Sequence, residues 1–257
     1  MIDSYEWFKQ EVLRITSIDL NSYKENQMKR RIDSLISRNK ANDYHSYIEI
    51  IKKDREKLEE FVSYLTINVS EFWRNIEQWN VLEKTVLPMI LKDDNLKVWS
   101  AACSTGDEPY SMVMLLSDYM PLSKVRIFAT DIDKQILIKA KAGIYSASSI
   151  KGLPEKYRRK YFTQLSDGAY EISEDIKKCV TFKEHNLLKD DYPSGFDLIL
   201  CRNVLIYFTD EAKAKIFARF SESLRKDGVL FLGSTEQILY PKEFGFVPIS
   251  SFFYKKL

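Results

Sequence analysis

Apolar residues in the first 66 positions recur at the spacing of amphipathic helices. Asp3 and Glu6 have the spacing of a capping box ahead of Trp7, which predicts a helix at the start of the chain. Further helices are expected over residues 22–38, 43–51 and 55–65. No glycine or proline precedes Pro88. We therefore predict an all-helical domain over residues 1–66 and a linker or lid helix over residues 67–95.

The pattern changes near residue 97, where short apolar runs begin to alternate with helical segments. Strands are predicted over residues 97–102, 125–130, 180–183, 196–201, 229–232 and 252–254. Helices are predicted over residues 108–119, 134–142 and 209–224, the last one stopped by Lys-Asp-Gly at 226–228. This alternation predicts an α/β fold with a doubly wound, mostly parallel sheet over residues 96–257.

One segment interrupts the alternation. Residues 161–172 contain Asp167-Gly168, a strong tight-turn signal between two short strands. We expect a small antiparallel β-subdomain, inserted over about residues 145–178.

Composition excludes several classes of protein. An apolar content of 45% in 257 residues predicts a substantial core, and a net charge of +2 gives no support to general polyanion binding. Cys103, Cys179 and Cys201 form no C-x-x-C pair and only two histidines occur, so neither a metal site nor a disulfide framework is expected. Without a signal sequence or a long apolar stretch, a cytoplasmic location is expected.

The loop after the first predicted strand is the first candidate site. It contains a single glycine, Gly106, followed by Asp107 and Glu108. These acids would repel the phosphates of a dinucleotide, but they suit the ammonium and sulfonium groups of S-adenosylmethionine. Alternatively, the two acids only stabilise the N-terminus of the next helix.

An acid follows the second predicted strand. Asp131 stands directly at the strand end, where a carboxylate can accept both ribose hydroxyls, and Asp133 is expected to cap the next helix. Nucleotide binders and adenosyl binders both use such an acid, so it does not choose between them.

Arg202 and Asn203 follow the buried run at 196–201, and Tyr207 comes four residues later. An arginine here could hold a carboxylate, although the segment could also be an ordinary polar loop with a core tyrosine. The N-P-P-Y motif typical of DNA amino-methyltransferases is absent from this place, which counts against a nucleobase substrate.

Residues 68–74, Asn-Val-Ser-Glu-Phe-Trp-Arg, mix polar and aromatic side chains in a connecting segment. They are expected either to pack between domains or to form a lid over a ligand and substrate.

Residues 24–40 carry six basic and two acidic residues, a local charge of +4. Such a run indicates a solvated helix face or a docking surface for an acidic partner.

Together these segments resemble the chemotaxis receptor methyltransferase family, CheR, over essentially the whole chain. The motifs that carry the resemblance are Asn68–Arg74, Trp99–Ser111, Ala129–Asp133, His185–Leu188, Cys201–Phe208 and Gly233–Glu236. The family motif usually has Glu where Asp107 stands, and often Phe where Trp73 stands.

The resemblance implies a helical domain, a methyltransferase domain and a small β-subdomain. It implies transfer of a methyl group from S-adenosylmethionine to receptor glutamates, leaving S-adenosylhomocysteine. Glu108 is expected near the methionyl end, Asp131 near the ribose, and Asn186 and Leu187 beside the adenine. The full set of expected cofactor contacts is Asn68, Ser70, Arg74, Ala102, Glu108, Asp131, Asn186, Leu187, Arg202 and Asn203.

Arg74 and Tyr207 are expected to orient the substrate carboxylate. A glutamate with a pKa of about 4.3 is already a nucleophile at neutral pH, so no general base is required and catalysis depends on alignment. The expected partner is the helical coiled coil of a receptor. The residues expected along its acidic surface are Lys24, Lys29, Arg30, Arg31 and Arg38.

Three other functions remain open from the residues themselves. These are an RNA methyltransferase that uses the basic helix for phosphates, a cofactor-binding regulatory module, and a nicotinamide-dependent oxidoreductase. The first predicts steep salt dependence of binding. The last is disfavoured by the acidic loop with its single glycine.

Overall fold

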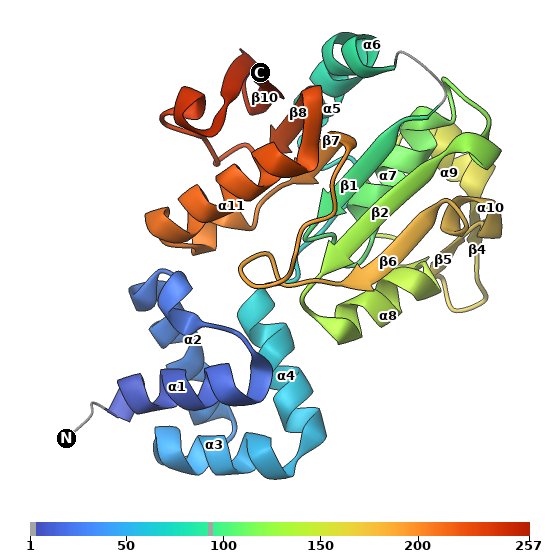
Figure 1. Cartoon of the computed structure of the whole chain (residues 1–257). Coiled ribbons are helices and arrows are strands. Elements are labelled where there is room, and N and C mark those ends of the chain that lie inside the picture. The colour runs from blue at the N-terminus through green and yellow to red at the C-terminus, as the bar shows by residue number, and fades with distance from the viewer. Residues whose placement is uncertain (1–3, 92–94) are drawn as a thin grey trace. The chain divides into compact units, whose positions relative to one another are not determined.

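The computed structural model describes residues 4–91 and 95–257 (Figure 1). The chain forms two compact units. One consists of Met1–Asn68 together with Tyr207–Ala214, and the other of Val69–Ile206 together with Lys215–Leu257. We call them the helical unit and the sheet unit.

Four helices form most of the helical unit. Their bounds are α1 Ser4–Thr16, α2 Glu25–Arg38, α3 Tyr44–Lys53 and α4 Arg55–Thr66, with a 3-10 turn, η1, at Leu20–Ser22. Each helix turns one apolar face inward, and the aromatic rings of Phe8, Tyr47 and Phe61 meet edge to face at its centre. The four predicted helices are therefore confirmed, except that the second begins at Glu25 instead of Ser22.

Side-chain caps define the starts of α3 and α4. Asp43 and Ser46 form a capping box at α3, and the Asp54 carboxylate accepts from the amides of Glu56 and Lys57 at α4. The predicted capping box at Asp3 lies outside the described residues.

The helical unit also contains a segment that the sequence assigns to the sheet domain. The Lys24 amide donates to the Tyr207 carbonyl at 2.8 Å, and the Thr209 amide donates to the Ser22 carbonyl at 2.9 Å. Between these bonds, the rings of Tyr23 and Phe208 pack 4.8 Å apart. Residues 207–214 thus complete the unit whose boundary was predicted at residue 66.

The sheet unit is built on seven strands in the order β6-β2-β1-β7-β8-β10-β9. Their bounds are β1 Lys97–Ala101, β2 Arg126–Asp131, β6 Val180–Glu184, β7 Phe196–Cys201, β8 Leu224–Leu232, β9 Phe246–Ser250 and β10 Phe253–Lys256. The first five strands in the sheet order are parallel, and β10 is antiparallel to both β8 and β9. The predicted doubly wound sheet is confirmed.

Two sheet predictions need correction. The strand predicted over 229–232 begins at Leu224, because the chain passes directly from helix α11 (Asp210–Ser223) into β8. The expected stop at Gly228 therefore lies inside the strand, next to Asp227 with a φ of 64°. Strand β9 was not predicted, since it contains Pro248, a residue that is unfavourable inside a strand.

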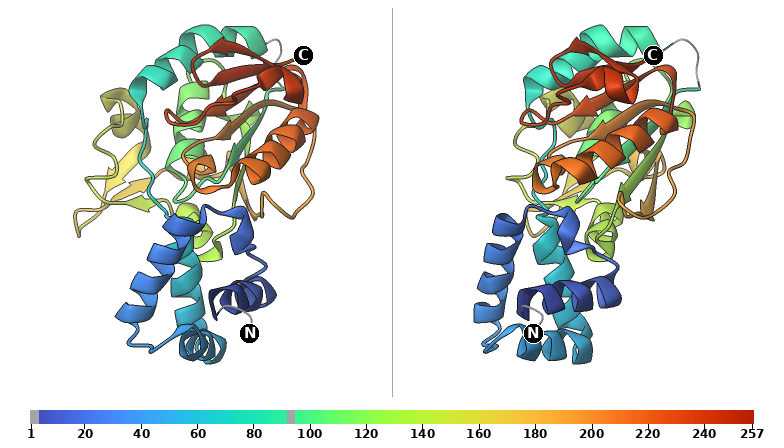
Figure 2. Two further views of the ribbon diagram at one scale, coloured as in Figure 1. Left: turned by 90° about the vertical axis from the view of Figure 1, so that its left-hand side faces the viewer. Right: turned by 60° about the vertical axis from the view of Figure 1, so that its left-hand side comes forward.

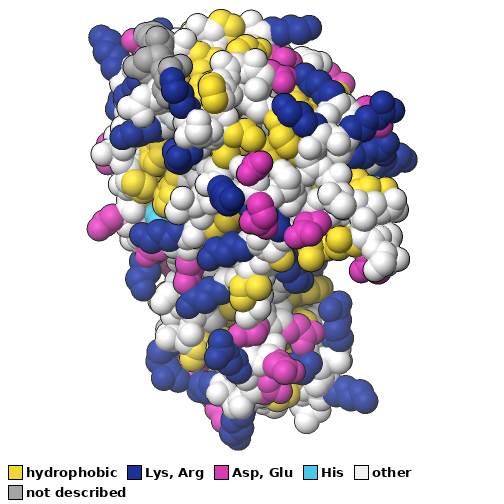
Figure 3. Space-filling view, turned by 90° about the vertical axis from the view of Figure 1, so that its right-hand side faces the viewer, with side chains coloured by type: hydrophobic (Ala, Val, Ile, Leu, Met, Phe, Trp, Pro, Cys, Tyr) yellow, Lys and Arg dark blue, Asp and Glu magenta, His cyan; other side chains and the backbone are white. Residues whose placement is uncertain are grey.

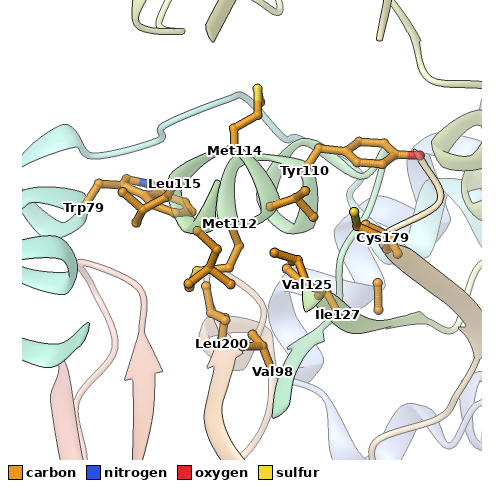
Figure 4. Close-up of a cluster of buried hydrophobic side chains, with 14 of the residues drawn as sticks. Trp79, Val98, Tyr110, Met112, Met114, Leu115, Val125, Ile127, Cys179 and Leu200 are labelled. Atoms are coloured by element: carbon orange, nitrogen blue, oxygen red, sulfur yellow. The ribbon is translucent and has the colours of Figure 1, made fainter. Parts of the chain in front are cut away.

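Helices cover both faces of the sheet (Figures 1 and 2). Helix α7 (Asp107–Leu116) packs on the face that carries Val98, and Figure 4 shows Met112 pointing toward Val98 and Leu200. The next residue along the strand, Trp99, points to the other face because side chains alternate. There its ring meets Phe220 of α11 at 5.5 Å.

A continuous helix leads into the sheet. It runs through α5 (Ile76–Val81), a π-helical segment η2 (Leu82–Val86) and α6 (Leu87–Ile90). Pro88 lacks the amide that an α-helix would need at that point, which accounts for the widened segment before it. This helix confirms the one expected within residues 67–95.

The predicted inserted hairpin is present as β4 (Phe162–Gln164) and β5 (Tyr170–Ile172). A short third strand, β3 (Ile144–Tyr145), pairs with β5, giving the order β3-β5-β4. The rings of Tyr145 and Phe162 pack edge-on against Phe72, so this β-subdomain is joined to the segment before α5.

The remaining elements of the sheet unit are short or connect strands. They are α8 (Lys134–Ala142), α9 (Glu155–Tyr161), α10 (Glu174–Lys177), η3 (Leu122–Lys124), η4 (Leu205–Tyr207, whose last residue belongs to the helical unit) and η5 (Pro241–Phe244).

Basic and acidic side chains are interspersed on the face drawn in Figure 3. None of the helices formed by residues 4–91 and 95–257 is long and apolar enough to cross a bilayer.

We predict that Phe61→Ala destabilises the protein by about 3–5 kcal/mol, because it removes a fully buried ring and leaves a cavity. Leu13→Ala, at a position on α1 that is 44% exposed, should cost less than about 1 kcal/mol. Thermal unfolding of the full chain, followed by circular dichroism, compares the two. Equal losses would contradict the assignment of Phe61 to the centre of the helical core.

Candidate active site

The candidate residues of the sheet unit gather where parallel strands end. The order of strands reverses between β1 and β7, since β2 and β6 extend one way and β8 the other. Ligands of doubly wound folds bind at the carboxyl ends of strands beside this reversal. The loops after β1, β2, β6, β7 and β8 all lead away from that edge.

The loop after β1 has an unusual backbone. Ala102, Ser104 and Gly106 alternate in the left-handed region, with φ of 69°, 50° and 87°. A Cβ on Gly106 would also lie 3.1 Å from the ring of Tyr110, so both the φ and the close contact favour glycine there. Because Ala102 has left the extended conformation, the strand predicted to reach it ends at Ala101 instead.

Asp131 connects the first three loops. Its carboxylate accepts from the amides of Ser104 at 2.8 Å and Asp133 at 3.1 Å. Its carbonyl accepts from the His185 amide at 2.9 Å. Burial raises the pKa of Asp131 to about 6. As predicted, Asp133 caps α8, accepting from the amides of Gln135 and Ile136.

Several acidic side chains lie close together around the loop after β1. Asp107 is only 1% exposed, and burial raises its pKa, while hydrogen bonds from Thr105 and Ser70 oppose that shift. Burial raises the pKa of the Cys103 thiol, and the nearby negative charges of Asp131 and Glu108 raise it further. A buried Asp107 oxygen, Oδ1, has no hydrogen-bond partner. This donor-poor, acidic environment fits a cationic ligand and disfavours a pyrophosphate.

Arg202 is buried, and both Nη atoms of its guanidinium donate to neighbouring groups. Its Nη1 donates to Glu108 Oε2 at 3.2 Å, and its Nη2 donates to the Arg74 carbonyl at 2.7 Å and to Gln78 Oε1 at 2.9 Å. The guanidinium also lies 4.6 Å from the ring centre of Phe231. Arg202 therefore joins the loop after β7 to α7 and to the segment before α5. The carboxylate that Arg202 contacts in this structure is that of Glu108, and its role toward a ligand stays a prediction.

The segment that precedes α5 is tightly packed. Phe72 and Trp73 are buried, and the Trp73 ring stacks on Tyr157 at 4.9 Å. Arg74 lies between two residues with positive φ, Trp73 at 54° and Asn75 at 60°. Such backbone costs about 1–3 kcal/mol per residue and is typical of functional sites. The partly exposed Arg74 side chain donates through Nη1 to the Val69 carbonyl at 3.1 Å.

Asn186 and Leu187 form a turn after β6. The Asn186 side chain accepts from the Leu188 amide at 2.9 Å, and the Asn186 amide donates to Asp190 at 2.8 Å. Arg219 of α11 donates to the Leu187 carbonyl at 2.9 Å. These bonds fix the conformation of the turn. It directly follows His185, whose amide donates to the Asp131 carbonyl.

The expected set of site residues divides between the two units. Ser70, Arg74, Ala102, Glu108, Asp131, Asn186, Leu187, Arg202 and Asn203 belong to the sheet unit. Asn68 and Tyr207 belong to the helical unit, where the Asn68 amide group donates to Thr66 Oγ1 at 3.0 Å.

One residue of the site was missed. Glu236, in the loop after β8, accepts from the backbone amide of Asn203 at 2.8 Å. It lies in the Gly-Ser-Thr-Glu motif that supports the family resemblance, but the sequence alone gave it no role. The signal in the sequence that could have identified Glu236 is an acidic residue shortly after the apolar strand that ends at Leu232.

The basic residues of α2 do not form one face. The Lys29 ammonium lies 5.3 Å from the Tyr5 ring centre, whereas the Arg31 and Arg38 guanidinium groups lie 4.5 and 5.0 Å from that of Tyr64. Arg31 also donates to the Tyr64 carbonyl. A helix turns 100° per residue, which puts Lys29 on a different side from Arg31 and Arg38.

Known families match both parts of this chain. The model of the CheR methyltransferase SAM binding domain matches residues 68–253, and that of the CheR methyltransferase all-alpha domain matches residues 3–66. The chain belongs to the CheR methyltransferase family. It is thus an S-adenosylmethionine-dependent methyltransferase, as the acidic loop and the resemblance predicted, and S-adenosylmethionine is its cofactor.

Individual CheR relatives are similar over most of their length. A chemotaxis protein methyltransferase of Listeria innocua is 45% identical over 98% of this chain and 97% of its own. One from Salmonella typhimurium is 34% identical over 82% of this chain and 74% of its own. Among solved structures, a putative sarcosine dimethylglycine methyltransferase from Galdieria sulphuraria has a TM-score of 0.44 and 13% identity, covering 68% of this chain and 63% of its own.

We predict that the affinity of this CheR protein for S-adenosylhomocysteine falls below about pH 6. Ribose hydroxyls bind the ionised form of Asp131 more strongly, so the bound state has the lower pKa. The dissociation constant should be constant above pH 6 and should rise by up to about tenfold per unit below it. Isothermal titration calorimetry between pH 5 and 8 measures this dependence.

Asp131→Asn should weaken binding and abolish the pH dependence. Asp133→Asn is the matched control, because asparagine still caps a helix. Since the Asp133 charge raises the pKa of Asp131, this variant should keep the dependence and move its midpoint to lower pH. A pH dependence that persists in Asp131→Asn would refute the assignment.

Proposed function

We propose that this enzyme methylates glutamate side chains of chemotaxis receptors, forming methyl esters that adjust receptor signalling. The observation that carries the proposal is the similarity to chemotaxis protein methyltransferases over nearly the whole chain, with the helical domain included. The proposed reaction takes place in the cytoplasm.

The residues of the site support transfer to a carboxylate. When bound, S-adenosylmethionine supplies a methyl group on a positively charged sulfur. Asp107 and Glu108, which lie near Cys103, would hold the cationic donor, and Asp131 would accept from its ribose hydroxyls. A glutamate acceptor is ionised at neutral pH, so its carboxylate is already a nucleophile and no group of the protein has to remove a proton from it. The protein therefore needs to supply alignment and not a base.

Arg74 is the residue best suited to orient the incoming carboxylate. Its backbone is held rigidly by Trp73 and by the Arg202 contact, while its side chain is partly exposed. A guanidinium that binds a carboxylate in a forked geometry fixes the direction of the attacking oxygen. The role that the family resemblance implies for Tyr207 stays a prediction.

Docking on the receptor is assigned to exposed cations in α2 and at Lys24, the residue before it. Lys24, Lys29, Arg30 and Arg38 are exposed, whereas Arg31 is partly buried against Tyr64. Lys29 lies on the opposite side of α2 from Arg38, beside Tyr5. We therefore keep Lys24, Arg30 and Arg38 as candidates for the acidic surface of a helical coiled coil and give Arg31 a structural role. Electrostatic contacts of this kind speed association and weaken with added salt.

A labelling experiment tests the proposed function. The protein is incubated with tritiated S-adenosylmethionine and membranes that contain chemotaxis receptors, and the labelled protein is then treated with alkali. Glutamate methyl esters release volatile methanol, whereas methylated amines and bases retain the label. Alkali-stable label, or label on RNA instead of receptor, would refute the proposal.

We predict that Arg74→Ala lowers the single-turnover rate of methyl transfer by about 10²-fold or more, because a misaligned nucleophile loses most of its effective concentration. Cofactor affinity should weaken much less. Arg55→Ala is the control, since Arg55 is an exposed arginine on α4. Rapid-quench transfer measurements and calorimetry separate the two effects. An unchanged single-turnover rate would remove Arg74 from the catalytic residues.

A further inference from the structure

Glu236 is buried and surrounded by backbone amides. Its Oε2 accepts from the amides of Asn203 at 2.8 Å and Gly233 at 2.7 Å. Its Oε1 accepts from the amides of Leu205 at 2.7 Å and Ile206 at 3.3 Å. Three of these four amides belong to the loop after β7, which is separated from Glu236 by about 30 residues of sequence.

Only a carboxylate satisfies this arrangement. Both of its oxygens accept and neither donates, whereas a glutamine would turn its NH₂ group toward two amide donors. Glu236 is 4% exposed, so its charge is balanced mainly by these hydrogen bonds. Replacing it leaves buried amides without acceptors, which is the costly way to break a hydrogen bond.

The two loops meet without spare room. A Cβ on Gly233 would lie 2.6 Å from Glu236 Oε2 and 2.8 Å from the Asn203 amide nitrogen. Asn203 itself has a φ of 60°, a left-handed conformation that needs support from its surroundings. Glu236 provides this support at the Asn203 amide, one peptide bond from Arg202.

Glu236 also acts on Arg202 through its charge. Burial lowers the pKa of Arg202, the Glu108 carboxylate raises it, and the Glu236 charge adds a smaller effect in the same direction. For Glu108, burial raises the pKa, Arg202 opposes that rise, and Glu236 adds a smaller upward effect. The charge of Glu236 is therefore a minor influence on the ion pair, and its main action is through the four hydrogen bonds.

We propose that Glu236 is a positioning residue of the methyltransferase site: it fixes the loop of residues 203–206, and with it Arg202 and Asn203, in the conformation that binds S-adenosylmethionine. The inference depends on the assignment of Arg202 and Asn203 to the cofactor. It does not depend on the identity of the methyl acceptor.

The test compares Glu236→Gln with Glu243→Gln, the same change at an exposed position in η5. Calorimetry with S-adenosylhomocysteine should give a dissociation constant at least about tenfold higher for Glu236→Gln, because two amides lose their acceptor. Glu243→Gln should stay within about twofold of the wild type. The measurement uses no receptor, so failure of the proposed acceptor would leave this result intact.

A purely structural role predicts a different outcome. It would lower the melting temperature of Glu236→Gln but leave the affinity unchanged at temperatures well below melting. A folded Glu236→Gln protein with wild-type affinity would therefore overturn the proposal.

Gly233→Ala is a second variant that disturbs the same loop while Glu236 stays in place. It tests the proposal if Glu236→Gln does not fold. The added methyl displaces the Asn203 amide and should also weaken S-adenosylhomocysteine binding by about tenfold or more. Unchanged affinity in folded Gly233→Ala would equally reject the inference.

Discussion

Burying a guanidinium is costly unless its charge is paired, and this constraint organises the site. Arg202 has almost no contact with water, so Glu108 balances its charge, and both of its Nη atoms donate to acceptors inside the protein. Those acceptors come from α7 and from the segment that begins α5. One side chain thereby sets the relation of three chain segments that are distant in sequence.

The rest of the site follows from an excess of acids around that cation. Asp107, Glu108 and Asp131 share the loops after β1 and β2, and the amide of Ser104 is already bonded to Asp131. A phosphate would meet negative charge there, with a key backbone donor already occupied. The sulfonium and ammonium groups of S-adenosylmethionine, in contrast, are positively charged and would be attracted by the same acids. The electrostatics therefore favour the cofactor that family membership assigns to this chain.

Sequence patterns predicted the elements that depend on local signals. The parallel strands, the α8 cap at Asp133 and the hairpin at Asp167-Gly168 all follow from residues close together in the chain. The pairing of Arg202 with Glu108 could not be predicted, since 94 residues separate the two. Three of the four amides that donate to Glu236 could not be predicted for the same reason, since they lie 30 to 33 residues away. The basic residues of α2 were grouped by sequence, although helical geometry divides them between two sides.

The pairing of residues 22–24 with 207–209 has a consequence for biosynthesis. The chain emerges from the ribosome in order, so the first 66 residues are made long before Tyr207 and Phe208. Until then, the Tyr23 ring and the Lys24 amide lack the partners that they have in the finished fold. The N-terminal helices thus reach their final packing only after most of the sheet unit has been synthesised, and cutting the gene at residue 66 would yield a fragment with one edge incomplete.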